Sequence, residues 1–188
     1  MTLKTKWINL IYNLATRSRK IGSFFTPLGA LFFSLTIFSI IIISLLVDKL
    51  LGITDILPRS LSLILASLLF LVAFILIGWS VLTFLRAKGT PVPVSPPPRL
   101  VTTGPYAYTR NPMLTGVFAL FFGIGVLLES FSLLVIFTPL FILVNVWELK
   151  AIEEPELLKR LGQDYVEYRK STPMFFPSLR KIFKRIKS

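Results

Sequence analysis

The sequence contains no cysteine and no histidine. These absences exclude thiol nucleophiles, disulfides and imidazole bases, and they remove the usual ligands of transition metals, so we expect no metal site. Charge is also scarce, because 16% of the 188 residues are charged and 54% are hydrophobic. A water-soluble domain of this size cannot bury so much apolar surface in one core. The lipid bilayer must therefore be part of the protein's solvent.

Four apolar stretches predict an all-α integral membrane bundle with about four transmembrane helices. They comprise residues 24–47, 61–85, 113–128 and 131–147. The first two exceed the ~20 residues that cross the hydrocarbon core. The last two are shorter and are separated only by Glu129 and Ser130, which predicts a helical hairpin because a carboxylate is costly away from water. One long re-entrant segment is the alternative.

The basic residues predict the orientation of the bundle. Of 21 lysines and arginines, five precede the first stretch, four lie in residues 86–110 and ten follow Trp147, whereas residues 48–60 hold two. The positive-inside tendency places both termini and the 86–110 loop in the cytoplasm, and the membrane is the plasma membrane if the organism is prokaryotic. The first stretch is too long for a cleavable signal, so we expect a retained span. Because the basic residues flank spans, the net charge of +12 does not indicate a nucleic-acid partner.

Both ends of the chain combine basic and apolar residues. Residues 1–23 favour a basic helix in the headgroup layer, with a disordered basic tail as the alternative. Residues 178–188 predict a basic amphipathic tail helix, which we expect to bind anionic lipid; a targeting peptide is the weaker interpretation. Its apolar positions are Leu179, Ile182, Phe183 and Ile186.

Two polar segments lie between the second and third spans. Residues 89–98 are rich in proline, which favours a stiff polyproline-type strap; a linker or a partner-docking peptide is the alternative. Residues 100–116 form a polar and aromatic turn in which Pro112 suits the first turn of a helix and Thr109 or Asn111 can cap it. Structural roles alone are sufficient to explain Gly104, Pro105, Asn111 and Pro112.

A carboxylate pair follows the fourth span. We expect Pro155 to interrupt the helix that leaves the membrane, so that Glu153 and Glu154 lie at a break. The next helix is predicted from Pro155 to about Lys170, with an apolar and aromatic side that packs back on the spans. That side carries Leu158, Leu161, Tyr165 and Tyr168. The alternative is solvated charge, balanced by Lys150, Lys159 and Arg160.

Several motifs in the second half of the chain follow one another in a fixed order. They are residues 98–113, then Glu153-Glu154-Pro155, then Gly162, Tyr165, Tyr168 and Pro173. In this order they resemble the membrane methyltransferase superfamily that contains isoprenylcysteine carboxyl methyltransferases and phospholipid N-methyltransferases. The resemblance covers about residues 89–177. It divides the chain into a basic interfacial segment (1–23), two spans (24–85), a methyltransferase-like region (86–177) and the tail helix (178–188).

The resemblance implies a cofactor, S-adenosylmethionine, held at the cytoplasmic end of the last two spans. Arg110 is suited to clamp the cofactor carboxylate, and Glu153 or Glu154 is suited to its ammonium group or ribose diol. Tyr106 and Tyr108 are suited to pack on the adenine or to face the sulfonium. Arg110, Glu153 and Glu154 are therefore the expected catalytic residues. The expected cofactor-binding residues are Tyr106, Tyr108, Arg110, Asn111, Pro112, Glu153, Glu154 and Tyr165.

Some positions depart from the superfamily pattern or permit another explanation. Asn111 and Leu114 stand where close relatives of the carboxyl methyltransferases usually have histidine and tyrosine, and residues 172–177 lack a basic residue. These departures disfavour a strict isoprenylcysteine enzyme. Gly123 and Gly125 resemble a glycine pair ascribed to cofactor binding, but inside a span small residues more often serve close helix packing.

The expected reaction is direct methyl transfer to a small amphipathic or lipid acceptor. Catalysis then comes mainly from alignment and from the exclusion of water. A prenylated or lipid carboxylate is nucleophilic at neutral pH, whereas an amine must first lose a proton. Two other functions are compatible with the sequence: an NADPH-dependent enzyme related to the sterol reductases, and a non-catalytic lipid-binding protein.

Overall fold

Every regular element in the described residues is helical. The computed structural model describes residues 3–16, 19–53, 56–89, 97 and 99–177. The α-helices are α1 (Leu3–Thr16), α2 (Arg19–Leu51), α3 (Arg59–Arg86), α4 (Pro112–Leu127), α5 (Thr138–Glu148), α6 (Glu154–Leu161) and α7 (Gln163–Ser171). A 3-10 turn, η1 (Gly104–Ala107), precedes α4, and two π-helical turns, η2 (Leu133–Phe137) and η3 (Leu149–Glu153), flank α5. Most of the predicted proline strap and all of the tail helix lie outside the described residues.

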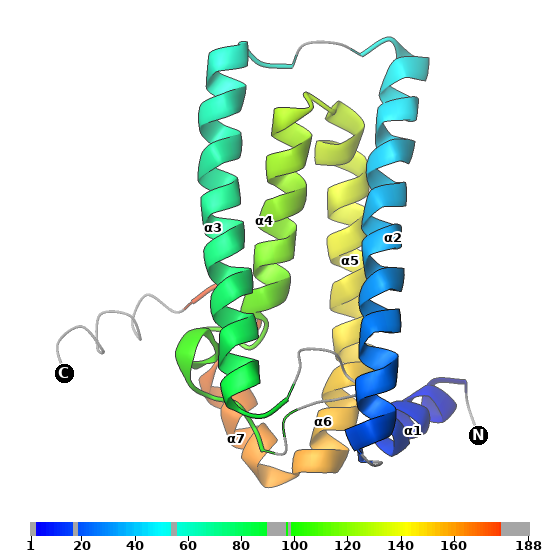
Figure 1. Cartoon of the computed structure of the whole chain (residues 1–188), viewed down its shortest axis with the longest axis vertical. Coiled ribbons are helices and arrows are strands. Elements are labelled where there is room, and N and C mark those ends of the chain that lie inside the picture. Colours follow the sequence, from blue (N-terminus) through cyan, green and yellow to red (C-terminus); the bar gives the residue numbers. More distant parts are fainter. Residues whose placement is uncertain (1–2, 17–18, 54–55, 90–96, 98, 178–188) are drawn as a thin grey trace, which may run out of the picture.

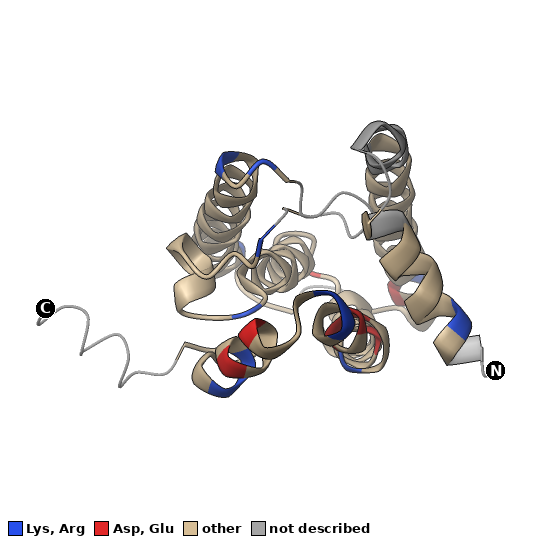
Figure 2. Ribbon diagram, turned by 90° about the horizontal axis from the view of Figure 1, so that it is seen from below, with Lys and Arg blue, Asp and Glu red and all other residues tan. Residues whose placement is uncertain are grey.

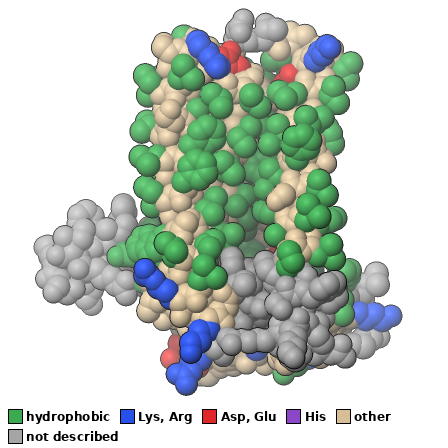
Figure 3. Space-filling model, viewed as in Figure 1, with side chains coloured by type: hydrophobic (Ala, Val, Ile, Leu, Met, Phe, Trp, Pro, Cys, Tyr) green, Lys and Arg blue, Asp and Glu red, His purple; other side chains and the backbone are tan. Residues whose placement is uncertain are grey.

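The protein is a multi-pass integral membrane protein. Three helical segments are long and apolar enough to cross a bilayer: Pro27–Leu51, Arg59–Arg86 and Leu133–Leu161. Helix α4 is apolar but shorter, with 16 residues or about 24 Å of helix. Apolar side chains cover the long helices, and charged side chains gather at and beyond their two ends (Figure 3). The all-α membrane architecture expected from the sequence is therefore confirmed.

The helices run up and down between two ends of the bundle (Figure 1). The α2–α3 connection and the α4–α5 turn lie at one end, which we call the tip end. Helices α1, α6 and α7 and the loop before α4 lie at the other end, which we call the site end (Figure 1). The predicted helical hairpin is thus observed, with its turn at Leu128–Ser130 and Glu129 in a left-handed conformation (φ 53°). Its tip does not reach as far as the ends of α2 and α3 (Figure 1).

Glycines allow α4 to lie close to α3, which is its main neighbour. A methyl group built on Gly116 would come within 2.8 Å of Ile77, and one on Gly123 would come within 2.7 Å of the ring of Phe70. Small residues of this kind permit close helix contacts in membranes, where burial from water supplies little driving force. On the other side of α4, Phe121 stacks on Phe141 of α5 with ring centroids 4.6 Å apart.

Polar contacts fasten the tip end. The carboxylate of Asp48, on α2, accepts hydrogen bonds from the hydroxyl of Ser130 and from the backbone N–H of Ser132 (2.9 Å). Glu129 accepts hydrogen bonds from Arg59 and from Ser62, each at 3.4 Å. These contacts tie the hairpin turn to both long helices, because a buried carboxylate must be paired or hydrogen-bonded.

Two predictions about the chain after the fourth span are wrong. Pro155 does not interrupt the helix, because the π-helical turn η3 lies directly before it and the chain continues into α6. A widened turn of this kind accommodates a proline that has no N–H to donate to the preceding turn. Instead, the break comes at Gly162, whose φ of 57° and ψ of −131° end α6 and begin α7. The single helix predicted from Pro155 to about Lys170 is therefore two short helices.

Candidate active site at one end of the bundle

Arg110 brings together three segments that are far apart in the sequence. It lies in the loop before α4, and its Nη1 donates to Oε1 of Glu154 on α6 at 2.5 Å and to the hydroxyl of Tyr165 on α7 at 3.3 Å. The side chains of Arg110 and Glu154 are only 12% and 14% exposed. A guanidinium–carboxylate pair with so little exposure is weakly screened by water. The convergence of Arg110 with Glu154 and Tyr165 creates a polar centre beneath the apolar helices.

Some polar groups of this centre keep unused binding capacity. The buried Nε of Arg110 has no hydrogen-bond partner within the described residues. Glu154 has a second, longer contact to Arg169 (3.5 Å), whereas Glu153 has no hydrogen bond or ion pair among the described residues. Figure 2, which looks onto this end, shows acidic and basic residues side by side on α6 and α7. A buried donor and a carboxylate without partners are the groups that a zwitterionic ligand satisfies.

The tyrosines divide into one at the ion pair and others that support the loop. Tyr165 contacts Arg110, and burial, followed by the negative charge of Glu154, raises the pKa of its phenol to about 12. The hydroxyl of Tyr168 donates to the backbone oxygen of Tyr106 at 2.7 Å. Burial raises the pKa values of Tyr106 and Tyr168 above their ordinary range. All three phenols therefore stay neutral near pH 7.

Tyr106 and Tyr108 lie against α3. The ring of Tyr106 is buried and meets the ring of Phe84 edge-on, with centroids 4.9 Å apart. The ring centroid of Tyr108 lies 6.4 Å from that of Trp79. Gly104 begins this turn with a φ of 59°, and a methyl group there would come within 2.7 Å of the Thr83 hydroxyl. These contacts dock the loop onto the end of α3 and so fix the point from which Arg110 projects.

The residues after α7 run beside the start of α4. Backbone N–H groups of Arg110 and Asn111 donate to the carbonyl oxygens of Pro173 (2.9 Å) and Met174 (3.1 Å). The side chain of Asn111 also donates to Met174, at 3.3 Å, and does not cap α4, whereas Pro112 is the buried first residue of that helix, as predicted. The pairing between the two segments was not predicted. The prolines at 173 and 177 were the available signal, since proline favours extended backbone that is free to pair with another segment.

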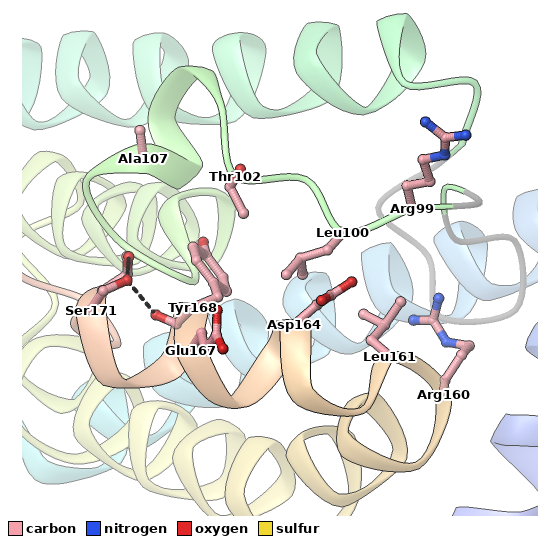
Figure 4. A pocket seen from close by; sticks show the side chains of 11 residues that line it. Arg99, Leu100, Thr102, Ala107, Arg160, Leu161, Asp164, Glu167, Tyr168 and Ser171 are labelled. Carbon is pink, nitrogen blue, oxygen red and sulfur yellow. Dashed lines mark hydrogen bonds between the residues drawn. The ribbon is translucent and has the colours of Figure 1, made fainter.

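A polar cavity of about 990 Å³ opens between the loop before α4 and helices α6 and α7 (Figure 4). Its lining consists of Arg99, Leu100, Thr102, Ala107, Arg160, Leu161, Asp164, Glu167, Tyr168, Ser171 and Thr172. Arg99 and Arg160 lie at one end and Ser171 at the other (Figure 4). None of the eight residues expected to bind cofactor lines this cavity. Tyr168 links the two places, because its ring is 6.4 Å from that of Tyr165.

The glycines of α4 lie away from the polar centre. Gly123 follows Pro112 by eleven residues, about 16 Å along the helix toward the tip end. A methyl group on Gly123 would meet Phe70, and one on Gly125 would come within 2.7 Å of Leu134. The packing role that the sequence favoured for these glycines is thus the one that their surroundings support.

Comparison with known proteins gives two findings. The family model described as "Phospholipid methyltransferase" matches residues 61–164, which is more than half of the chain. A nickel-cobalt-cadmium resistance protein, NccN, of Alcaligenes xylosoxydans xylosoxydans is 36% identical over 80 residues. That alignment covers 43% of this chain and 37% of NccN, so the chain matches little more than a third of this relative's length. The family match contains Arg110, Glu153 and Glu154.

Proposed function

The chain belongs to the phospholipid methyltransferase family, and from this premise we propose that it transfers a methyl group from S-adenosylmethionine to a small amphipathic or lipid acceptor. The observation that carries the proposal is the meeting of Arg110, Glu154 and Tyr165 at the site end. These side chains come from the loop before α4, from α6 and from α7. Next to this ion pair, the buried Nε of Arg110 and the carboxylate of Glu153 have no hydrogen-bond partner among the described residues, so both are available to a ligand.

The residues at the site end suit the polar groups of the cofactor. When bound, S-adenosylmethionine supplies a methyl group activated by a sulfonium. The Nε of Arg110 is a free donor for a carboxylate, while Nη1 keeps its contact with Glu154. Glu153, which has no partner among the described residues, is suited to an ammonium group or a ribose diol. Asn111, Pro112, Tyr106 and Tyr108 then hold the loop that presents Arg110.

Little acid–base chemistry is required from the protein. A carboxylate acceptor is already nucleophilic, whereas an amine acceptor must give up a proton, for which Glu153 is the nearest carboxylate without a partner. The tyrosines stay neutral because burial raises their pKa values, so they serve as rigid apolar walls and hydrogen-bond donors. Alignment of the acceptor and exclusion of water then provide the rate enhancement.

In this proposal the methyl donor and the acceptor reach the site from different phases. We propose that the site end faces the cytoplasm, because 19 of the 21 basic residues belong to segments connected at that end. A water-soluble methyl donor then arrives from the aqueous side, and an apolar-tailed acceptor arrives from the bilayer. In this proposal residues 86–177 form the catalytic region, and the two long helices before them provide the membrane anchor.

The test is methyl transfer by the purified protein in lipid nanodiscs. Radiolabelled S-adenosylmethionine and a total lipid extract are supplied, and the labelled products are identified by mass spectrometry. We expect one class of lipid or amphipathic product to become labelled. Arg110→Lys should abolish labelling because a lysine cannot reproduce the forked donor geometry, whereas Arg59→Lys at the tip end should not. Absence of any labelled product, or equal labelling by the Arg110 variant, would contradict the proposal.

A further inference from the structure

Helix α1 packs on the segment that carries the paired glutamates. It contacts both α6 and the π-helical turn η3. Lys159 of α6 makes two of these contacts: its Nζ donates to Oδ1 of Asn9 at 2.9 Å and lies 4.1 Å from the centre of the Tyr12 ring. Because Glu153 ends η3 and Glu154 begins α6, α1 lies directly behind the candidate active site.

Two large apolar side chains of α1 are exposed, among the exposed polar residues Thr5, Lys6 and Asn13. Trp7 and Leu10 are 55% and 48% exposed and stand three residues apart, which puts them on one face of the helix. Ile8, Asn9 and Tyr12 are half-buried, in agreement with the packing on α6. Lys6 is exposed beside the apolar face. This combination of an exposed tryptophan, an apolar face and a lysine is typical of a helix at a membrane surface.

Charge and position indicate which surface α1 meets. The first 47 residues contain five lysines and arginines and no aspartate or glutamate. Only residues 17 and 18 separate α1 from α2, whose apolar segment Pro27–Leu51 is long enough to span a bilayer. The chain therefore holds α1 near the headgroups, where basic segments are attracted to anionic lipid. A protein partner would have to compete with that surface.

We propose that α1 binds the anionic lipid surface through Trp7, Leu10 and Lys6, and that this binding clamps η3 and α6 in the position seen here. Lipid charge thereby regulates the order of the segment that carries Glu153 and Glu154. The link from lipid charge to methyl transfer rests on the proposed function. The lipid contact and the clamping do not depend on it, so they can be measured without any reaction.

The lipid contact is tested by fluorescence of a protein in which Trp7 is the only tryptophan (Trp79→Phe and Trp147→Phe). The protein is reconstituted in phosphatidylcholine vesicles with or without phosphatidylglycerol, and the acyl chains carry bromine as a quencher. We expect Trp7 to be quenched, and more strongly when phosphatidylglycerol is present. Lys6→Glu should remove the extra quenching, whereas Lys170→Glu, at an exposed position on α7, should not. Quenching that is absent, or that is independent of phosphatidylglycerol, would overturn the proposal, as would cross-linking of Trp7 to a second copy instead of lipid.

The clamping is tested by amide hydrogen exchange over residues 149–161. Exchange should be about tenfold slower in vesicles that contain phosphatidylglycerol, because the clamped segment opens less often. Lys159→Ala should restore fast exchange, and Lys170→Ala should leave the slow rate unchanged. If exchange responds to lipid charge in a protein that transfers no methyl group, the proposed function fails and the clamp stands. If methyl transfer occurs but the exchange rate changes neither with lipid charge nor with Lys159→Ala, the clamp is wrong.

Discussion

The two ends of the bundle treat their carboxylates differently. At the tip end, Asp48 and Glu129 both accept hydrogen bonds from neighbouring helices and turns. At the site end, Glu154 is held by Arg110, but Glu153 has no partner among the described residues and the Nε of Arg110 is buried without one. Hydrogen-bonded carboxylates fasten a fold, whereas unsatisfied polar groups cost stability. The contrast concerns the charged groups, because the buried hydroxyl of Ser132 at the tip end also has no hydrogen-bond partner within the described residues. We therefore interpret the tip end as a fastening and propose that the site end receives a ligand.

The largest difference between the ends should appear when one glutamate is replaced at each. Glu154→Gln removes the anchor of Arg110, and loss of one partner from a buried charge pair costs about 2–5 kcal/mol, so affinity for S-adenosylmethionine should fall about 100-fold. Glu129→Gln at the hairpin turn should leave that affinity unchanged. Equilibrium binding to both purified variants, with thermal unfolding as the folding control, measures the contrast. Equal affinities would erase the distinction between the two ends.

Replacement of Asp48 should have the opposite profile. Asp48→Ala leaves the hydroxyl of Ser130 and the N–H of Ser132 without their acceptor, which should cost about 2 kcal/mol of unfolding free energy. Affinity for the cofactor, measured on the folded fraction, should stay the same because the site lies at the other end. A variant with unchanged thermal stability would show that Asp48 does not fasten the hairpin.

Replacement of Glu153 sharpens the comparison further. Glu153→Gln removes a carboxyl group that has no hydrogen bond or ion pair among the described residues and lies close to the carboxylates of Glu148 and Glu156. The melting temperature should therefore not fall, while cofactor affinity should drop about tenfold, the loss of one charge-assisted hydrogen bond. Thermal unfolding and equilibrium binding of the same preparation measure the melting temperature and the cofactor affinity. A clear loss of stability with normal affinity would assign Glu153 to the fold alone.

The smallest expected effect concerns the glycines of the membrane helices. In Gly123→Ala the new methyl group would come within 2.7 Å of the ring of Phe70. The substitution should destabilise the α3–α4 contact by about 1 kcal/mol, at the low end of overpacking costs. Gly78→Ala has no atom within 4 Å of the new methyl group and serves as the matched control. Neither substitution should alter cofactor affinity. A Gly123 variant that is stable but weak in binding would restore the cofactor role for this glycine.

The sequence was a good guide to the helices because hydrophobic length and turn residues are local. The second apolar stretch, predicted as residues 61–85, is helix α3 (Arg59–Arg86), and the turn predicted at Glu129 and Ser130 is present. The break at Gly162 was missed, since a glycine within a helical pattern is tolerated and only its positive φ reveals the break. The π-helical turn before Pro155 was missed because proline usually signals an interruption.

The candidate site was only partly predictable. The three residue types Arg110, Glu154 and Tyr165 were expected to serve one ligand, and the structure brings them into contact across 44 and 55 residues of chain. The direct ion pair between Arg110 and Glu154 was not predicted, because it depends on how α6 packs below the start of α4. The polar cavity beside Arg99 and Arg160 was also missed. Its lining comes from a loop and two helices whose relative placement no local pattern encodes.

Calorimetric titration of the purified protein with S-adenosylmethionine tests the ligand-receiving role of the site end most directly. We expect saturable binding at one site per chain, strongly weakened by Arg110→Lys and preserved by Arg59→Lys. Two results would contradict that role: no saturable heat of binding to the folded protein, or the same affinity for the Arg110→Lys variant as for the wild type.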